Sequence, residues 1–458
     1  MPSSPLPRPG KTPRRAQKKA QTLEGIQDER FSETDRFLTL LRQRCQTSAA
    51  WDLEWAERSL RAALLQDGRR LLESLVAAVP EPDFQRQPGQ RAYAARSNTV
   101  LSAFGWLTYA RTYYQAPGQA GSCPLDNVLG ILGGCTPMAA RLLCRTAART
   151  PYVEGAEDLL ELAGLEVEPS FIQQLAQQVG TRGQPLLERL TVPAPADAQT
   201  IYIMSDGTGV PMAKPELEGR AGKGPDGQAS TREVKLAAVF TQTILDAEGH
   251  PERDPASTTY LGTFESSDEF GGRLRQAALA RNVGQFPRQA YLGDGAAWVW
   301  TIGSQCFPQA RQILDFYHGG EHVSELAKLV FDDPGSAQNM TLRWQALLYD
   351  SELDVLLAEA RQKALPQKQA AVAKALQYFE NNRERMDYKK YRQEGYFIGS
   401  GVVEAGCKKV IGGRLKQSGM FWKLPGANAV TVLRCALFSA TGWGQFWKMF
   451  YELPTARN

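Results

Sequence analysis

The stretch Ile201-Tyr-Ile-Met-Ser-Asp-Gly-Thr-Gly-Val210 is an apolar run that reaches an acidic residue, Asp206, followed by glycine. A second stretch of the same kind, Tyr291-Leu-Gly-Asp-Gly-Ala-Ala-Trp298, carries Asp294. Such runs are typical of buried strands, so we expect each strand to end at its aspartate and to deliver a carboxylate to the edge of a sheet. Taken singly, each Asp-Gly pair is about as typical of a hairpin turn, which would carry no chemistry.

A third stretch with flanking glycines, Gly399-Ser-Gly-Val-Val-Glu-Ala-Gly-Cys-Lys408, has the pattern of a helix start. Ser400 is a residue type that caps helices through its side chain. Glu404 then falls near the first turn, where the helix dipole favours an anion. The sequence therefore offers three carboxylates from three separate segments, those of Asp206, Asp294 and Glu404.

Strands and helices alternate around the first two carboxylates. Three strands are expected first, over residues 200–204, 233–243 and 258–264. A helix over 267–281, a strand over 289–292, a helix over 296–306 and a strand over 312–316 follow in that order. This is the order of an α/β fold of the ribonuclease H-like kind, here over 200–320, in which helices flank a mixed sheet and the two aspartate-bearing strands are neighbours. Helical periodicity over 321–395 predicts a helical insertion, although a separate interaction domain has the same pattern. Residues 396–458 would close the core with the helix of Glu404.

Three clustered carboxylates need a counterion. At about 5 Å and an effective dielectric of about 20, each like-charged pair costs roughly 3 kcal/mol. Oxygen-only ligands favour magnesium or manganese. Two such ions, roughly 3.5–4 Å apart, support displacement at a phosphodiester. The triad of Asp206, Asp294 and Glu404 therefore predicts a site for two Mg²⁺ or Mn²⁺ ions that acts on nucleic acid.

Composition narrows the class of protein. The 458 residues suffice for two to four domains, and the net charge of +4 permits nucleic-acid binding only through local basic surfaces. The sequence has no apolar run of membrane-spanning length, and its basic N-terminus, a disordered arm over 1–27, lacks the apolar core of a secretory signal. Seven cysteines without a CxxC pair and three histidines argue against a zinc cluster. We therefore expect a cytoplasmic, nucleoid-associated protein.

Two regions precede the expected core. Residues 28–90 are helical and end in a linker rich in proline and glutamine, and residues 91–130 form a small β-module in which aromatic residues alternate with arginines such as Arg96 and Arg111. These arginines would contact DNA phosphates. Ordinary strand packing with solvated arginines is an equally good interpretation.

Residues 131–190 contain the outline of a helix-turn-helix between Tyr152 and Gly180. One helix breaks at Gly164, and Pro169 opens a second. The second helix presents Gln173, Gln174 and Gln177, and glutamine pairs bidentately with adenine in the major groove. Because arginine and lysine are absent from this second helix as predicted up to Gly180, a purely structural helical hairpin is an equal alternative.

Several motifs in one order resemble a known family. The chain resembles bacterial insertion-sequence transposases of the ISKra type, within the DDE superfamily, from about Tyr93 to Trp447. The motifs are Cys123-Pro-Leu-Asp126, Asp206-Gly-Thr-Gly-Val-Pro211, Gly293-Asp-Gly-Ala-Ala-Trp298, Asp315-Phe-Tyr-His318, Gly399-Ser-Gly-Val-Val-Glu404 and Arg414-Leu-Lys-Gln-Ser-Gly-Met-Phe-Trp422.

The resemblance implies roles for particular residues. Asp206, Asp294 and Glu404 would hold the metal ions, and His318, placed by Asp315, would lie near the scissile phosphate. It further implies that three basic residues contact DNA phosphates, namely Lys408, Arg414 and Lys416. Relatives often carry a cysteine pair after the β-module, whereas this chain has Cys123 alone, so we expect no zinc there.

The sequence thus predicts a DNA transposase that binds the terminal inverted repeats of its element and performs metal-dependent cleavage and strand transfer. Its partners would be the transposon ends and target DNA, as double-stranded DNA, and it would act as a homodimer or higher assembly. Two alternatives are a domesticated DNA-binding protein without catalysis and a structure-specific nuclease without strand transfer.

Overall fold

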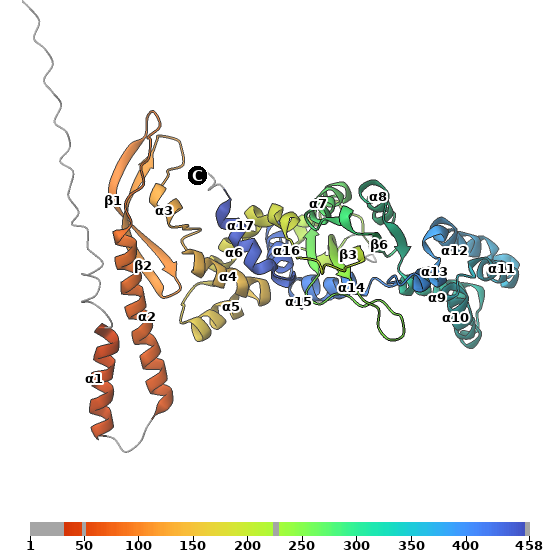
Figure 1. The fold of residues 1–458 in the computed structure, drawn as a ribbon, viewed down its shortest axis with the longest axis horizontal. Coiled ribbons are helices and arrows are strands. Elements are labelled where there is room, and N and C mark those ends of the chain that lie inside the picture. The colour runs from red at the N-terminus through yellow and green to blue at the C-terminus, as the bar shows by residue number, and fades with distance from the viewer. Residues whose placement is uncertain (1–31, 48–51, 223–228, 454–458) are drawn as a thin grey trace, which may run out of the picture. The chain divides into compact units, whose positions relative to one another are not determined.

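A computed structural model describes residues 32–47, 52–222 and 229–453 (Figure 1). The basic arm expected over 1–27 lies outside these residues. The chain separates into two compact units, one up to Ala139 and one that runs from Ala140 to Thr455.

The first unit starts with a helical hairpin of α1 (Ser32–Thr47) and α2 (Leu53–Ala78). Asp67, buried on α2, accepts hydrogen bonds from the backbone N–H groups of Glu33 and Thr34, at 3.0 and 2.9 Å. These N–H groups belong to the first turn of α1, where no helical carbonyl can accept them. The Asp67 carboxylate therefore fixes the start of α1 on α2.

A two-stranded antiparallel sheet follows, made of β1 (Arg91–Ser102) and β2 (Gly105–Gln115). Its buried side includes Val100 and Leu107, and it packs against α2 and the short helix α3 (Pro124–Val128). The register shifts between Tyr93 and Arg96, as in a β-bulge. The aromatic segment is therefore a β-hairpin, as its sequence predicts.

The second unit contains a five-stranded mixed sheet in the order β5-β4-β3-β6-β7. The central strand β3 (Thr200–Pro211) pairs antiparallel with β4 (Thr231–Gln242), which pairs antiparallel with β5 (Thr259–Thr263). On its other side β3 runs parallel to β6 (Arg288–Gly293), and β6 runs parallel to β7 (Arg311–Leu314). The protein thus has the α/β architecture that the sequence predicts. Four of the five strands lie within two residues of their expected bounds, whereas β3, expected over 200–204, continues to Pro211.

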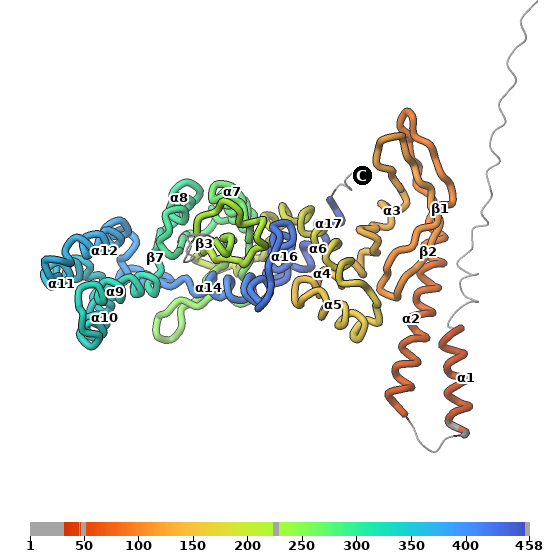
Figure 2. The backbone as a smooth tube through the Cα atoms, turned by 180° about the vertical axis from the view of Figure 1, so that it is seen from behind, coloured from red at the N-terminus to blue at the C-terminus, as the bar shows by residue number. Residues whose placement is uncertain are grey.

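Helices connect and cover these strands. The helix α7 (Ser267–Ala280) links β5 to β6 and starts with a capping box between Ser266 and Glu269. The helix α8 (Ala297–Cys306) links β6 to β7. A later helix, α16 (Leu424–Phe438), contacts both β5 and α6 (Pro169–Gly183) and lies between the sheet and the helices that precede it (Figure 2).

The helices before the sheet pack tightly on α16. A Cβ atom at Gly180 of α6 would lie 2.4 Å from the Cα atom of Ala429, so only glycine allows this approach. The break expected at Gly164 is present, in the left-handed conformation with φ 67°. The helical elements of this part are α4 (Pro137–Arg149), α5 (Tyr152–Asp158), the π-helical η1 (Leu159–Ala163), α6 and the 3₁₀ helix η2 (Gln184–Arg189).

An all-helical segment separates β7 from the last part of the sequence. It begins at Phe316, directly after β7, rather than at 321 as predicted. It has a core of its own that includes Trp344, Leu356 and Phe379. Its helices are α9 (Phe316–Val330), α10 (Pro334–Tyr349), α11 (Leu353–Lys363), α12 (Gln369–Asn382) and α13 (Tyr388–Gln393).

The C-terminal elements return to the sheet. The helix α14 (Gly401–Gly406) contacts β3 and β4, and it continues into a π-helical turn, η7 (Cys407–Gly412). The remaining elements are α15 (Gly413–Leu415), α16, α17 (Gly442–Glu452) and the single-turn helices η3 (Lys214–Glu216), η4 (Val283–Gln285), η5 (Pro366–Lys368) and η6 (Arg383–Arg385). In the described parts of the chain, no helix has the length and apolarity that crossing a membrane requires.

Candidate active site

The register of the two central parallel strands places Asp206 beside Asp294. Ser205 of β3 is paired with Gly293 of β6, and each aspartate is the next residue along its strand direction. Asp206 does not end its strand, contrary to the prediction, because β3 continues to Pro211 in its pairing with β4. Only the parallel pairing ends there. Neither aspartate is therefore a hairpin-turn residue, and both carboxylates stand where β3 and β6 diverge.

Glu404 approaches from α14, which contacts the same strand, β3. The Ser400 side chain does not cap this helix, contrary to the prediction. Instead, its hydroxyl donates a hydrogen bond to Oε1 of Glu404 at 3.1 Å. The π-helical turn begins three residues later, at Cys407, and such turns are frequent at functional sites.

The electrostatics show that these carboxylates share one environment. Burial raises the pKa of Asp206, and the negative charges of Asp294 and Glu404 raise it further, while hydrogen bonds from the Cys407 thiol and the Gly207 N–H act in the opposite direction. The Gly207 N–H donates at 2.7 Å. Without a cation, ionising Asp206 is therefore unfavourable, which is the property expected of a metal-ligating carboxylate.

The three carboxylates do not form a tight cage. Within the described ranges, the one set of three acidic or histidine side chains with ligand atoms all within 4.8 Å is Asp246, Glu248 and His250. That set is an exposed turn, in which Asp246 Oδ1 accepts the N–H groups of the other two residues. The oxygens of the Asp206, Asp294 and Glu404 side chains are accordingly spaced more widely.

Asp315 connects the two ends of the helical segment. Its buried carboxylate accepts the N–H of His318 at 2.7 Å and, through a short hydrogen bond, the N–H of Ser400. Its own N–H donates to the carbonyl of Gly293 at 2.9 Å, next to Asp294. One side chain thus fixes the start of α9 and the start of α14 beside the sheet.

His318 lies in the first turn of α9, not in a loop, and its ring is about one-third exposed. Its Nδ1 is 3.3 Å from Oε2 of Glu321, and its ring contacts that of His322 edge-on at 5.0 Å. Burial lowers the pKa of His322, and the neighbouring His318 adds to this effect. The structure thus places a histidine pair on the helix that follows β7.

Tyr378 of α12 is a site neighbour that the sequence does not predict. Its ring stacks near His322 at 3.8 Å, and its hydroxyl donates to the carbonyl of Asp294 at 3.4 Å. A Cβ atom at Gly295 would lie 2.8 Å from this hydroxyl, so the glycine after Asp294 is required. The Asp-Gly pair is the only signal of this contact in the sequence, and it does not identify the tyrosine.

The three basic residues of the C-terminal motif have different surroundings. Lys416 is exposed and donates a short hydrogen bond to Thr208, two residues after Asp206, and Lys408 is exposed on η7. Arg414 is buried, and its guanidinium donates to the Ala147 carbonyl at 3.3 Å. The expectation that Arg414 contacts DNA phosphates is therefore wrong, because its side chain is part of the core.

The DNA-binding residues that the sequence predicts upstream of the sheet also differ in their exposure. Gln173 and Gln174 are exposed on α6, whereas Gln177 is half-buried toward α16. In the β-hairpin Arg96 is exposed, but Arg111 forms an ion pair with Asp126 at 2.8 Å. This carboxylate neutralises Arg111, so the structure does not support a phosphate contact there.

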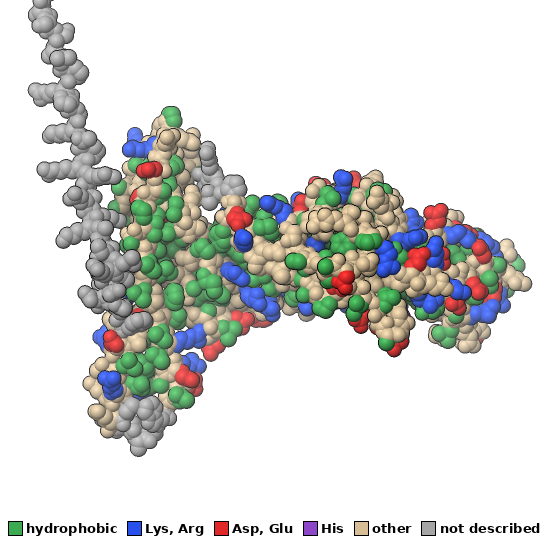
Figure 3. Space-filling view, viewed as in Figure 1, with side chains coloured by type: hydrophobic (Ala, Val, Ile, Leu, Met, Phe, Trp, Pro, Cys, Tyr) green, Lys and Arg blue, Asp and Glu red, His purple; other side chains and the backbone are tan. Residues whose placement is uncertain are grey.

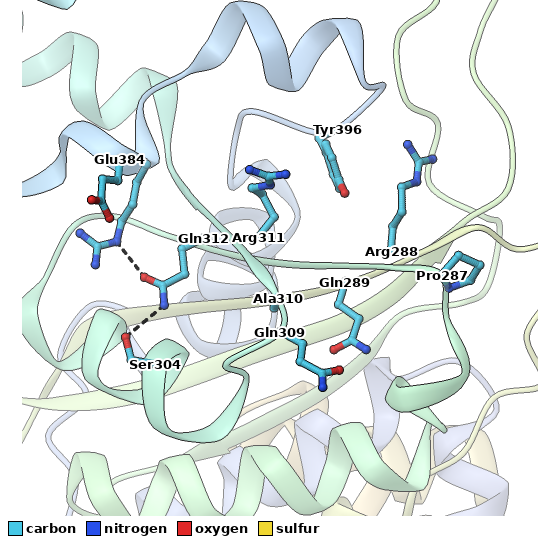
Figure 4. A pocket seen from close by; sticks show the side chains of 11 residues that line it. Pro287, Arg288, Gln289, Ser304, Gln309, Ala310, Arg311, Gln312, Glu384 and Tyr396 are labelled. Carbon is cyan, nitrogen blue, oxygen red and sulfur yellow. Dashed lines mark hydrogen bonds between the residues drawn. The ribbon is translucent and has the colours of Figure 1, made fainter.

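A polar hollow of about 490 Å³ lies at the opposite end of the parallel strands (Figure 4). Arg288 begins β6, Arg311 begins β7, and both line it. The side-chain amide of Gln312, which also lines the hollow, donates a hydrogen bond to the Ser304 hydroxyl at 3.1 Å and accepts one from Arg385 at 2.8 Å. Because the carboxylates stand at the other end of these strands, this hollow is not part of the candidate active site.

Comparison with protein-family models and with curated proteins finds no match. Among solved structures, the chain is similar to the Drosophila P element transposase strand transfer complex, with a TM-score of 0.24 and 9% sequence identity. The similarity covers 69% of this chain and 80% of that chain. At this TM-score it supports no conclusion about fold or activity, and the candidate site must be interpreted from its own residues.

Proposed function

We propose that this chain is a DNA transposase of the DDE superfamily, of the ISKra type, with a ribonuclease H-like catalytic core. It would bind the terminal inverted repeats of its element, cleave DNA and transfer the cut strand. The observation that carries the proposal is the convergence of Asp206, Asp294 and Glu404 on one edge of the sheet.

The topology supports the ribonuclease H-like assignment. Three antiparallel strands in sequence order are followed by two parallel strands on the other side of the first, with helices in both connections. The all-helical segment then leaves after β7 and returns at α14. A carboxylate from the first strand, one from the fourth and one from the returning helix thus meet at one edge of the sheet.

The carboxylates suit two Mg²⁺ or Mn²⁺ ions. Magnesium ligands lie at about 2.1 Å, so two oxygens on opposite sides of one ion are about 4 Å apart. At least one pair of these three side chains has its ligand oxygens more than 4.8 Å apart, a separation that two ions can span. Such ions, when bound, activate an attacking hydroxyl and stabilise the leaving oxygen. The raised pKa of Asp206 fits the same role, because a cation would relieve the repulsion that disfavours its ionised form.

Neighbouring residues would act on the phosphate rather than on the ions. His318 is half-exposed and can donate a hydrogen bond to a phosphate oxygen, whereas neutral imidazole is a poor ligand for magnesium. Lys416, beside Thr208 on β3, would contact the phosphates that flank the cleaved bond. Because both ends of an element must be joined, we further propose a homodimer or higher assembly on DNA.

Two rival functions make different predictions. A domesticated DNA-binding protein would bind DNA but would need none of the three carboxylates. A structure-specific nuclease would cut but would not join a cut end to target DNA.

The first experiment measures cleavage and strand transfer, with Mg²⁺, on duplexes made from the DNA that flanks the coding region on each side. Asp206→Asn, Asp294→Asn and Glu404→Gln should each abolish both reactions while a gel shift shows retained binding, because phosphate contacts elsewhere dominate affinity. Asp246→Asn, in the exposed acidic turn, is the matched control and should remain active. Full activity in any of the three variants would contradict the proposed triad.

A second readout does not depend on activity. Since the pKa of Asp206 is raised, its ionised form destabilises the metal-free fold, and this cost appears as the pH rises from below the ordinary aspartate pKa through the raised one. Metal-free Asp206→Asn should therefore unfold at a higher temperature than the wild type at pH 7. Mg²⁺ should raise the melting temperature of the wild type but not of the variant. The opposite order without metal would argue against a repulsive carboxylate cluster.

A further inference from the structure

The helix α4 presents a row of arginines to solvent. Arg141, Arg145 and Arg149 are all exposed and follow one another at four-residue spacing, so they share one face of the helix. Within the part of the chain that the structure describes, none of the three forms an ion pair with a carboxylate. Like charges at this spacing repel each other, so the row is unfavourable for the isolated protein. Such a row is typical of a surface that meets an anion.

A hollow of about 610 Å³ adjoins this row. Arg145, Arg149 and Arg434 line it, together with an apolar floor that includes Leu142, Leu159 and Phe438. Asp158 is the only carboxylate among the lining residues, so the charge of the lining is positive. Basic side chains gather over the α4 and α5 region in the space-filling view (Figure 3).

Two buried arginines add positive charge beneath the row. Arg434 donates to the carbonyls of Ala148, at the end of α4, and of Val410, in η7. Arg414 donates to the carbonyl of Ala147 in the same helix turn. Burial lowers the pKa of Arg434 to about 10, and the positive charges of Arg414 and Arg149 contribute to the shift. Neither buried guanidinium forms an ion pair in the described structure. Burial lowers the pKa of Arg414, and the charge of Glu154 acts to raise it. The positive charge beneath the row is therefore only partly offset.

These contacts also make the arginine row rigid. Cationic groups at the end of α4 interact favourably with the negative end of its dipole and satisfy its last carbonyls. Arg434 also donates to the carbonyls of Lys409 and Val410, in the π-helical turn that follows Glu404. The row is therefore fixed relative to the proposed catalytic helix.

The size of the row matches a duplex. At 1.5 Å per residue, Arg141 to Arg149 extends about 12 Å, a length over which double-stranded DNA carries about seven phosphate charges. The exposed face of α6, by contrast, offers Gln173 and Gln174, and the one arginine of this helix, Arg182, lies half-buried in its last turn over the Phe450 ring. Phosphate contacts position a protein on DNA, and glutamines cannot supply that attraction.

We propose that the arginine row of α4 and the adjoining hollow bind the phosphate backbone of DNA. The arginines contact the phosphates, and the apolar floor accommodates the uncharged sugar of the same strand. This inference rests on the proposed function and adds α4 to the surfaces that the sequence predicts for DNA contact, among them the glutamines of α6.

The test uses the full-length protein and a fluorescent 30-bp duplex of arbitrary sequence, whose affinity is measured from 50 to 200 mM KCl. Removing one phosphate contact reduces the slope of log affinity against log salt by about 0.9. Arg145→Ala/Arg149→Ala should therefore reduce the slope by about 1.8. Across this fourfold salt range, the wild-type affinity should fall about 12 times further than that of the variant.

Three control variants test whether the salt dependence comes from the charges on α4, from exposed arginines in general or from α6. Arg145→Lys/Arg149→Lys keeps the charges and should restore most of the slope. Arg275→Ala removes an exposed arginine from α7 and should leave the slope unchanged. Gln173→Ala/Gln174→Ala should also leave it unchanged, and a loss of slope there instead would return the contact to α6 and overturn the proposal.

An unchanged slope in the Arg145→Ala/Arg149→Ala variant would likewise overturn the proposal. Thermal unfolding checks that both arginine variants fold, which is expected because the substituted side chains are exposed. Asp206→Asn should keep the full slope, so this experiment fails independently of the proposed cleavage. Active cleavage by Asp206→Asn would refute the catalytic triad and leave the DNA surface standing.

Discussion

Replacing Asp315 tests how the chain positions Glu404. Its carboxylate caps α9 through the N–H of His318 and also accepts the buried N–H of Ser400. Losing a helix cap costs about 1 kcal/mol, and leaving a buried N–H unsatisfied costs about 1–3 kcal/mol. Asp315→Ala should therefore lose about 2–4 kcal/mol of unfolding free energy, measured by urea denaturation of the metal-free protein.

Asp315→Ser separates these two contributions. Serine is a good helix cap but is too short to reach Ser400, so this variant should lose only the second contribution, about 1–3 kcal/mol. Since the Ser400 hydroxyl donates to Glu404, cleavage by Asp315→Ser should fall further than the folded fraction does. Hydrogen exchange at the Ser400 amide should accelerate. Unchanged exchange, with a loss below about 0.5 kcal/mol, would show that Asp315 does not hold α14.

Three other substitutions test the packing and the chemistry. Gly180→Ala should lose about 1–3 kcal/mol of unfolding free energy, because the new methyl group would force α6 away from α16. Gly272→Ala, whose Cβ would meet open space, is the control and should be neutral or gain up to about 1 kcal/mol. Equal effects of the two substitutions in urea denaturation would contradict the contact between α6 and α16. The hydrogen bond from Arg343 lowers the pKa of Glu359 to about 2. The ionised Glu359 therefore stabilises the packing of α10 on α11 above the ordinary glutamate pKa, and this stabilisation is lost as the pH falls toward 2. Acid titration of Glu359→Gln, followed by circular dichroism, should lack that step. His318→Ala should slow cleavage without raising the Mg²⁺ concentration needed for half-maximal rate, and rescue by excess Mg²⁺ would instead make His318 a ligand.

The sequence was sufficient to predict the sheet because each strand is an apolar run bounded by polar or glycine residues. The proximity of Asp206 to Asp294 follows only from the expected strand order. No local signal encodes the contact between two strands so far apart in sequence, such as that of Ser205 with Tyr291, 86 residues later. Tyr378 was missed for the same reason. Cys407 was within reach of prediction, because it lies three residues after Glu404 on the same helix.

The sequence predictions are wrong where an apolar residue is exposed or a charged residue is buried. Leu160 and Leu162 belong to the apolar pattern of the first helix in the expected helix-turn-helix, but they are 54% and 76% exposed. The chain is π-helical over this same stretch, and the wider turn moves these side chains out of the face that α-helical spacing predicts. Their exposure places Leu162 at the hollow beside α4, so the deviation contributes to the proposed DNA surface.

Arg414 shows the opposite error, because arginine is among the residues least often fully buried. Its motif suggested a phosphate contact, yet its guanidinium and that of Arg434 bind the last carbonyls of α4. Two buried cations without carboxylates are costly, and removal of either would leave backbone carbonyls unpaired in the core. An anion bound across the exposed arginines of α4 would offset part of that cost. We therefore expect bound DNA to stabilise the contact between α4 and η7, where Arg434 links the proposed DNA surface to the helix that carries Glu404.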